Sequence, residues 1–158
     1  MSAKVIPLQE WLTTFRSAAE ELARTSLRFD PNPRPTGKPE SGEPGAYIAI
    51  LSPHNAVHLG LSASPAECRA LARALLGLRH HEELSEHDVV DGLSEVMNIL
   101  AGKVKASMAG KDGQLSLGLP MFVRDPIRAG KESEAVTAET TLGSVDCTLR
   151  VYRRQRAA

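Results

Sequence analysis

The sequence lacks an excess of charge of either sign, a cysteine framework and a long apolar run. Its 19 basic and 19 acidic residues give a formal net charge of zero, which argues against nucleic-acid binding, because nucleic-acid binders normally carry a basic excess. Two cysteines cannot form a disulfide framework or a four-ligand zinc site. No run approaches the roughly 18 apolar residues of a membrane span, and residues 1–10 lack the apolar segment of a secretory signal. We therefore expect a cytoplasmic protein without a membrane or nucleic-acid partner.

The length and composition predict one domain. The chain has 158 residues, of which 42% are apolar and 24% are charged, as in ordinary globular proteins. Between residues 30 and 45 prolines and glycines are frequent, which predicts a surface loop inside a single domain that spans residues 1–158. The chain has no Walker loop, no G-x-G-x-x-G and no G-x-S-x-G, so common nucleotide and serine-hydrolase chemistry has no support.

Hydrophobic periodicity predicts helices and strands in separate runs along the chain. Helices are expected over residues 7–25, from Pro65 to about Gly77, and from Ser85 to about Gly110. Strands are expected over residues 46–51, 56–61, 115–123, 134–141 and 145–151. Because strands follow one another in pairs, the sequence predicts an α+β fold with helices packed on a largely antiparallel β-sheet.

The expected helix over residues 88–108 has two sharply different faces. At about 100° per residue, its polar members fall within roughly 80° of one another; they are Asp91, Glu95, Asn98, Gly102 and Lys105. The opposite side is aliphatic, with Val89, Leu93, Met97, Leu100, Val104 and Met108. We expect the aliphatic face to pack on the sheet and the polar face to point outward. A solvated helix face without any function is the simpler alternative.

Three details of this polar face favour a binding function. Gly102 lies mid-helix, where it costs about 1 kcal/mol relative to alanine but allows a partner to approach closely. Asn98 is a poor helix former at a position where no local structure needs it. Glu95 and Asn98, three residues apart, stand side by side and can address one target together.

The same residues resemble the motif of the CheC/CheX/FliY chemotaxis phosphatases. The family pattern is Asp or Ser, three residues, Glu, two residues, Asn, and then about twenty-two residues to Pro. Here the matching residues are Asp91, Glu95, Asn98 and Pro120, with twenty-one residues in the last gap. The flanking EVMNILAGKVKASM and the order of elements from Ala46 to Tyr152 also resemble the family. Because the chain has one such motif and not two, it resembles CheX more than CheC.

This resemblance implies hydrolysis of the aspartyl phosphate of a CheY-like receiver domain. By analogy with the family, Asn98 would orient the attacking water and Glu95 would pair with the receiver's active-site lysine. Asp91 and Pro120 would serve local geometry, and Gly102 and Lys105 would lie at the contact with the receiver. The resemblance implies no metal or cofactor in this protein, because the receiver holds its own Mg²⁺.

The resemblance also implies a homodimer, since CheX members pair through their sheets. The alternative to a phosphatase is a module without catalytic activity, which binds the phosphorylated receiver or serves as a scaffold in chemosensory signalling. The two differ in whether the receiver loses its phosphate faster when the protein is bound.

Overall fold

The computed structural model describes residues 4–29, 42–79, 81–125 and 133–154. Within these ranges the helices are α1 (Leu8–Thr25), α2 (Pro65–Leu76) and α3 (Glu86–Met108). The strands are β1 (Gly45–Leu51), β2 (Ala56–Ser62), β3 (Ser116–Leu117), β4 (Met121–Val123), β5 (Ser133–Leu142) and β6 (Val145–Arg154). The predicted surface loop lies largely outside the described residues.

Residues with strong capping preferences set the ends of α2 and α3. Ser64 caps α2 by accepting a hydrogen bond from the Glu67 N–H, and Gly77 ends the helix in a left-handed conformation that glycine adopts without steric cost. Ser85 and Asp88 form a capping box at the start of α3. These caps satisfy amides that a helix cannot pair internally, and they fix where α3 begins relative to the rest of the fold.

The strands of the described residues form a six-stranded antiparallel sheet. Its order is β3-β1-β2-β6-β5, and β4 pairs with β1 alongside β3. In register, Ile48 of β1 lies opposite Leu59 of β2, and Leu59 lies opposite Val151 of β6. These alternate apolar residues therefore line a single face of the sheet.

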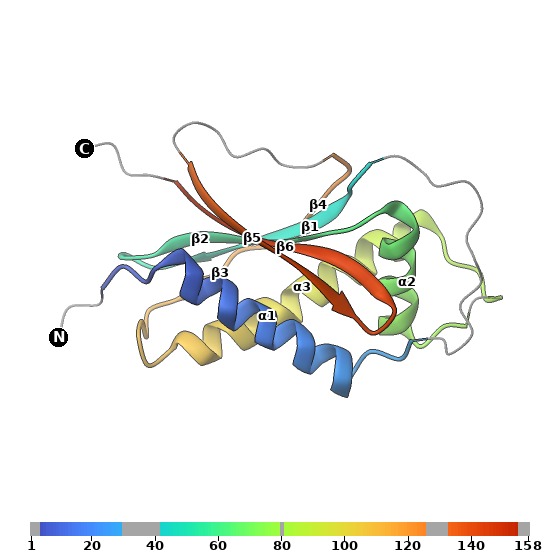
Figure 1. Ribbon diagram of the computed structural model, residues 1–158, viewed down its shortest axis with the longest axis horizontal. Helices are drawn as coiled ribbons and strands as arrows, with labels where there is room; N and C mark the ends of the chain where they lie inside the picture. The colour runs from blue at the N-terminus through green and yellow to red at the C-terminus, as the bar shows by residue number, and fades with distance from the viewer. Residues whose placement is uncertain (1–3, 30–41, 80, 126–132, 155–158) are drawn as a thin grey trace.

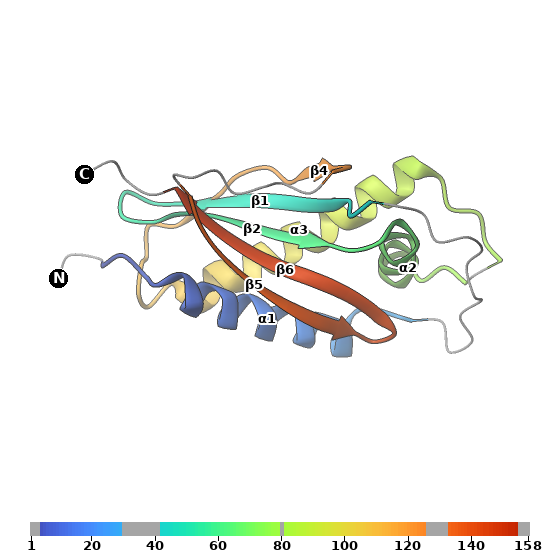
Figure 2. The same ribbon diagram turned by 45° about the horizontal axis from the view of Figure 1, so that its top comes forward.

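All three helices lie on that face, as Figures 1 and 2 show, with α1 and α3 along the sheet and α2 near one end. The α1 helix packs against β5 and β6, whereas α3 packs against β1, α1 and α2. Trp11 and Phe15 of α1 and Leu100 of α3 are fully buried in the core between these layers. The predicted α+β fold with helices on an antiparallel sheet is confirmed.

The predicted strand over residues 115–123 is wrong in its continuity. The structure divides it into β3 and β4, which pair with different parts of β1. Between them the Gly118 N–H still donates to the carbonyl oxygen of Ala49, 2.8 Å away. Pro120 follows, and since proline has no N–H it cannot donate a ladder hydrogen bond. Alternating apolar residues therefore predicted strand structure in this segment but not the break between β3 and β4.

The two cysteines, Cys68 on α2 and Cys147 on β6, are free thiols buried in the core. Burial raises the pKa of each thiol to about 12, so both are protonated at neutral pH. They therefore act as small apolar side chains, not as nucleophiles. Among the helices that the structure describes, none is both long enough and apolar enough to cross a membrane.

Candidate functional site

The α3 helix carries the predicted polar face and presents it away from the core. Its buried side is aliphatic, with Leu93, Met97, Leu100, Val104 and Met108 packed under the sheet and against its neighbours. At its first half α3 also lies very close to α2: a Cβ added at Gly92 would come 2.9 Å from the Cβ of Ala72. Packing on two sides fixes the rotation of the helix, so the polar face has one orientation.

Glu95 and Asn98 lie next to each other on this exposed face. Both residues are exposed, and they are one helical turn apart. Within the part of the chain that the structure describes, neither side chain forms a hydrogen bond or an ion pair. A carboxylate and an amide with no internal partner are available to a partner molecule. Either residue, if buried, would have contradicted the predicted site.

Asp91 differs from these two because it has a partner on its own helix. His87, one turn earlier, places its Nε2 atom 3.1 Å from Oδ2 of Asp91, and both side chains are well exposed. Sequence reasoning missed His87, although its spacing of four residues from Asp91 was a usable signal. The pair extends the polar face by one turn and holds the Asp91 side chain along the helix surface.

Gly102 and Lys105 continue the face toward the end of α3. A Cβ added at Gly102 would meet no atom within 4 Å, so internal packing does not require glycine there. Lys105 is exposed and forms no ion pair with any described residue. Its neighbour Lys103, by contrast, pairs with Glu21 of α1 at 3.1 Å. The exposed face of α3 therefore has no side chain at Gly102 and a positively charged side chain at Lys105, about one turn later.

Pro120 lies beside α3, because the chain that follows the helix runs back along it. Both β3 and β4 contact α3, and Arg124 just after β4 approaches Glu86 at the start of the helix, with a 3.5 Å contact between Nη2 and Oε2. Pro120 precedes Arg124 by four residues, or about 13 Å of strand. A helical segment of the same length, about 13 Å, that begins at Glu86 ends at about Glu95. Pro120 therefore lies at about the same level along the axis of α3 as Glu95.

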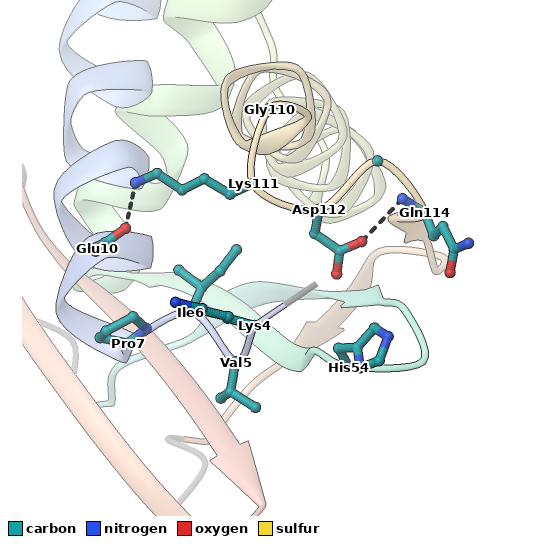
Figure 3. Close-up of a pocket in the computed structure, with 11 residues that line it drawn as sticks. Lys4, Val5, Ile6, Pro7, Glu10, His54, Gly110, Lys111, Asp112 and Gln114 are labelled. Atoms are coloured by element: carbon teal, nitrogen blue, oxygen red, sulfur yellow. Dashed lines mark hydrogen bonds and ion pairs between the residues drawn. The ribbon is translucent and has the colours of Figure 1, made fainter. Parts of the chain in front are cut away.

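A cavity away from the polar face lies between the first described residues, the β1–β2 turn and the end of α3 (Figure 3). It has a volume of about 690 Å³, and no predicted site residue is among its described lining residues. In Figure 3 Lys111 points to Glu10, with which it forms an ion pair, and the Asp112 carboxylate accepts a hydrogen bond from the Gln114 N–H. Of the basic groups around this cavity, Lys111 is thus neutralised by Glu10.

Beneath that cavity lies a buried polar network that the sequence did not reveal. The Asp112 carboxylate accepts hydrogen bonds from the Ser52 hydroxyl and from Nδ2 of Asn55, the latter at 2.8 Å. Asn55 Oδ1 in turn accepts the N–H of Ile6 at 2.9 Å. Asn55 and Asp112 are both 2% exposed. The network joins three distant segments, and each polar group in it is satisfied, so its role is structural.

No metal centre is evident in the region that the structure describes. The residues in ranges 4–29, 42–79, 81–125 and 133–154 include no group of three or more His, Cys, Asp or Glu arranged to hold a metal ion. The face of α3 offers two carboxylates, an imidazole, an amide and an ammonium group, which suit hydrogen bonding and ion pairing with another macromolecule.

Comparisons with solved structures give the same fold. The chemotaxis protein CheX from Vibrio vulnificus is 15% identical, with a TM-score of 0.69 over 91% of this chain and 99% of that chain. CheX from Desulfovibrio desulfuricans is 17% identical, with a TM-score of 0.69 over 90% and 97%. A CheX–CheY–BeF3–Mg²⁺ complex from Borrelia burgdorferi is 13% identical, with a TM-score of 0.63 over 94% and 97%.

Sequence comparison gives the family directly. No curated protein sequence matches the chain significantly. The family model described as chemotaxis phosphatase CheX matches residues 45–138, which is more than half of the 158 residues and includes α3 and all four motif positions. The chain therefore belongs to the CheX family of chemotaxis phosphatases.

Proposed function

We propose that this protein hydrolyses the aspartyl phosphate of a CheY-like receiver domain and that the exposed face of α3 enters the receiver's active site. The observation that carries the proposal is the pair Glu95 and Asn98, exposed side by side and without internal partners. Membership of the CheX family and the fold shared with a CheX solved in complex with CheY support a receiver as the substrate.

Asn98 would orient the water that attacks the phosphorus atom. Its side-chain oxygen accepts a hydrogen bond while its NH₂ group donates two, so one amide can hold a water at a defined angle. An acyl phosphate is already reactive, and positioning alone contributes up to roughly 7–11 kcal/mol to a rate enhancement. The P–O bond to the aspartyl carboxylate breaks as the water oxygen bonds to phosphorus, which releases phosphate and regenerates the carboxylate.

The remaining residues of the face would bind the receiver. Glu95 would pair with the receiver's active-site lysine, next to the water held by Asn98. Lys105, free of any described ion pair, would face acidic groups of the receiver. Asp91, held by His87, and Pro120, beside the helix, would shape the contact and take no part in the chemistry. The protein would need no cofactor of its own, since Mg²⁺ belongs to the receiver.

The decay of a phosphorylated CheY-like receiver tests this proposal. The receiver is labelled with a small phosphodonor in the presence of Mg²⁺, and its phosphate is followed with and without the protein. We expect faster decay that saturates with receiver concentration. Binding without faster decay would instead support a receiver-binding module that lacks catalytic activity, and no binding would remove the receiver as the partner.

Replacement of Gly102 by alanine should have opposite effects on stability and on function. Because a Cβ at this position meets nothing within 4 Å, alanine should raise the free energy of unfolding by about 1 kcal/mol through its higher helix propensity. If the receiver's surface closely approaches this point, the added methyl should raise KM about fivefold or more. Ser107→Ala, on the same helix but outside the polar face, is the control. A more stable variant with unchanged KM would show that no partner approaches Gly102.

We also expect a homodimer in the cytoplasm, where it would meet the receiver. Paired copies would each keep the α3 face exposed, because a face used between copies could not act on a receiver. Sedimentation equilibrium of the full chain measures the mass directly. A monomer at micromolar concentration would contradict the expected pairing without affecting the proposed chemistry.

A further inference from the structure

Leu119 is the most exposed of the large apolar residues in the described chain. Its exposed fraction is 89%, compared with 57% for Met121 and 49% for Leu76. A leucine held almost entirely in water contributes nothing to the core, although burial of its side chain elsewhere would be favourable. Single exposed apolar residues are common, so the position of Leu119 decides whether it has a function.

The connection that carries Leu119 is anchored on both sides. Before it, Gly118 is fixed to β1 by the hydrogen bond from its N–H to the Ala49 carbonyl. A Cβ at Gly118 would lie 3.4 Å from the Cβ of Ala49, so the two backbones are in close contact. After it, Pro120 restricts the backbone, and β4 resumes pairing with β1 at Met121. The leucine is therefore presented from a backbone with little freedom to fold back.

Leu119 lies beside the middle of α3. It precedes Arg124, which contacts Glu86, by five residues, or about 17 Å of extended chain. Asn98 follows Glu86 by twelve residues, or about 18 Å of helix. The two segments run antiparallel and in contact, so Leu119 and Asn98 are at nearly the same distance along the helix axis.

The side of α3 that faces this connection can be identified as well. Val90, one residue before Asp91, lines a cavity of about 360 Å³ together with Phe122 of β4. Asn98 follows Val90 by eight residues, a rotation of about 80° on the helix from the β4 side toward the exposed face. The β4 side of α3 therefore borders the polar face, and the connection between β3 and β4 leads into this side.

We propose that Leu119 is an apolar docking residue for the receiver, at the edge of the Glu95–Asn98 face; the inference rests on the proposed function. A receiver that brings its phosphorylated aspartate to Asn98 must cover the surface next to it, and that surface includes the exposed Leu119. The partner chemistry is an apolar patch beside the receiver's active site. The polar residues of α3 then give orientation, while Leu119 contributes affinity through burial.

The test is Leu119→Ser, assayed with the phosphorylated receiver beside wild type. We expect Kd for the receiver and KM for dephosphorylation to rise about tenfold, with kcat unchanged, because docking is lost while Asn98 remains in place. Leu76→Ser, on α2 and also exposed, is the matched control and should leave both constants unchanged. Circular dichroism and urea unfolding confirm that both variants fold.

Three results would overturn the inference. If Leu119→Ser leaves Kd and KM at wild-type values while the wild-type protein still dephosphorylates the receiver, the proposed function holds and the docking role fails. If Leu119→Ser converts a dimer to a monomer in sedimentation equilibrium, the residue belongs to the contact between copies. If the wild-type protein neither binds nor dephosphorylates the receiver, the proposed function itself fails, and the docking role fails with it.

Discussion

Asn98→Ala should slow the stimulated decay of the phosphorylated receiver by about a hundredfold or more, close to the receiver's own rate. The expected loss is large because the variant removes the group that positions the water, and a single positioning donor can contribute 10²–10³ to a rate. Binding should change little, since a small amide that acts on water in the transition state contributes little to the affinity of the ground state. Single-turnover decay, with this protein in increasing excess over the phosphorylated receiver, gives the maximal rate constant and the Kd separately.

Two further variants separate the roles on this face. Asn98→Asp has nearly the same shape but no N–H donor, and its charge opposes the phosphate, so it should be as inactive as alanine. Glu95→Gln should raise KM more than it lowers kcat, because it removes an ion pair with the receiver. If Asn98→Ala retained full kcat, water positioning would have to be assigned to another residue.

Asp112→Ala should lower the free energy of unfolding by about 3 kcal/mol. The variant leaves the Ser52 hydroxyl and Nδ2 of Asn55 without their buried acceptor, and an unpaired buried donor costs about 1–3 kcal/mol. Trp11, the single tryptophan, is fully buried in the core and reports urea unfolding by fluorescence. Asp125→Ala, at an exposed position, is the control. A loss below about 1 kcal/mol would show that water replaces the carboxylate.

The same carboxylate predicts a pH dependence. The hydrogen bond from Ser52 chiefly holds the pKa of Asp112 below its ordinary value, with help from Asn55 and the Gln114 N–H, and against the effect of burial. A group with a lowered folded-state pKa stabilises the fold above its unfolded pKa of about 3.9, and the contribution is lost as the pH falls through the folded value. Wild type should therefore lose more stability than Asp112→Ala when the pH falls below about 4.

The sequence predicted the face of α3 well because local rules determine it. A helix has one period, so the positions of Glu95 and Asn98 relative to Leu100 follow from their numbers alone, and Ser85 marks where the helix begins. The structure places both polar residues on the exposed side, as expected. Their roles in the receiver's active site stay predictions.

What the sequence did not reveal depends on contacts between distant segments. Asp112 lies between Gly110 and Gly113 and so resembles an exposed turn residue, yet it is buried against Asn55, 57 residues earlier. Similarly, the division of the expected strand at Gly118 and Pro120 depends on a contact with β1, in which the Gly118 N–H donates to the Ala49 carbonyl oxygen. Periodicity contains no information on such pairings, because they arise only when the sheet has formed.

The packing of α1 against the β5–β6 hairpin has a consequence for synthesis on the ribosome. The helix is made first, but the strands it covers follow its end at Thr25 by more than a hundred residues. Until they emerge, Trp11, Phe15 and Leu22 have no β5 or β6 to pack against, and a short helix alone in water is marginally stable. The nascent chain thus carries an exposed apolar segment for most of its translation, which is the kind of segment that chaperones bind.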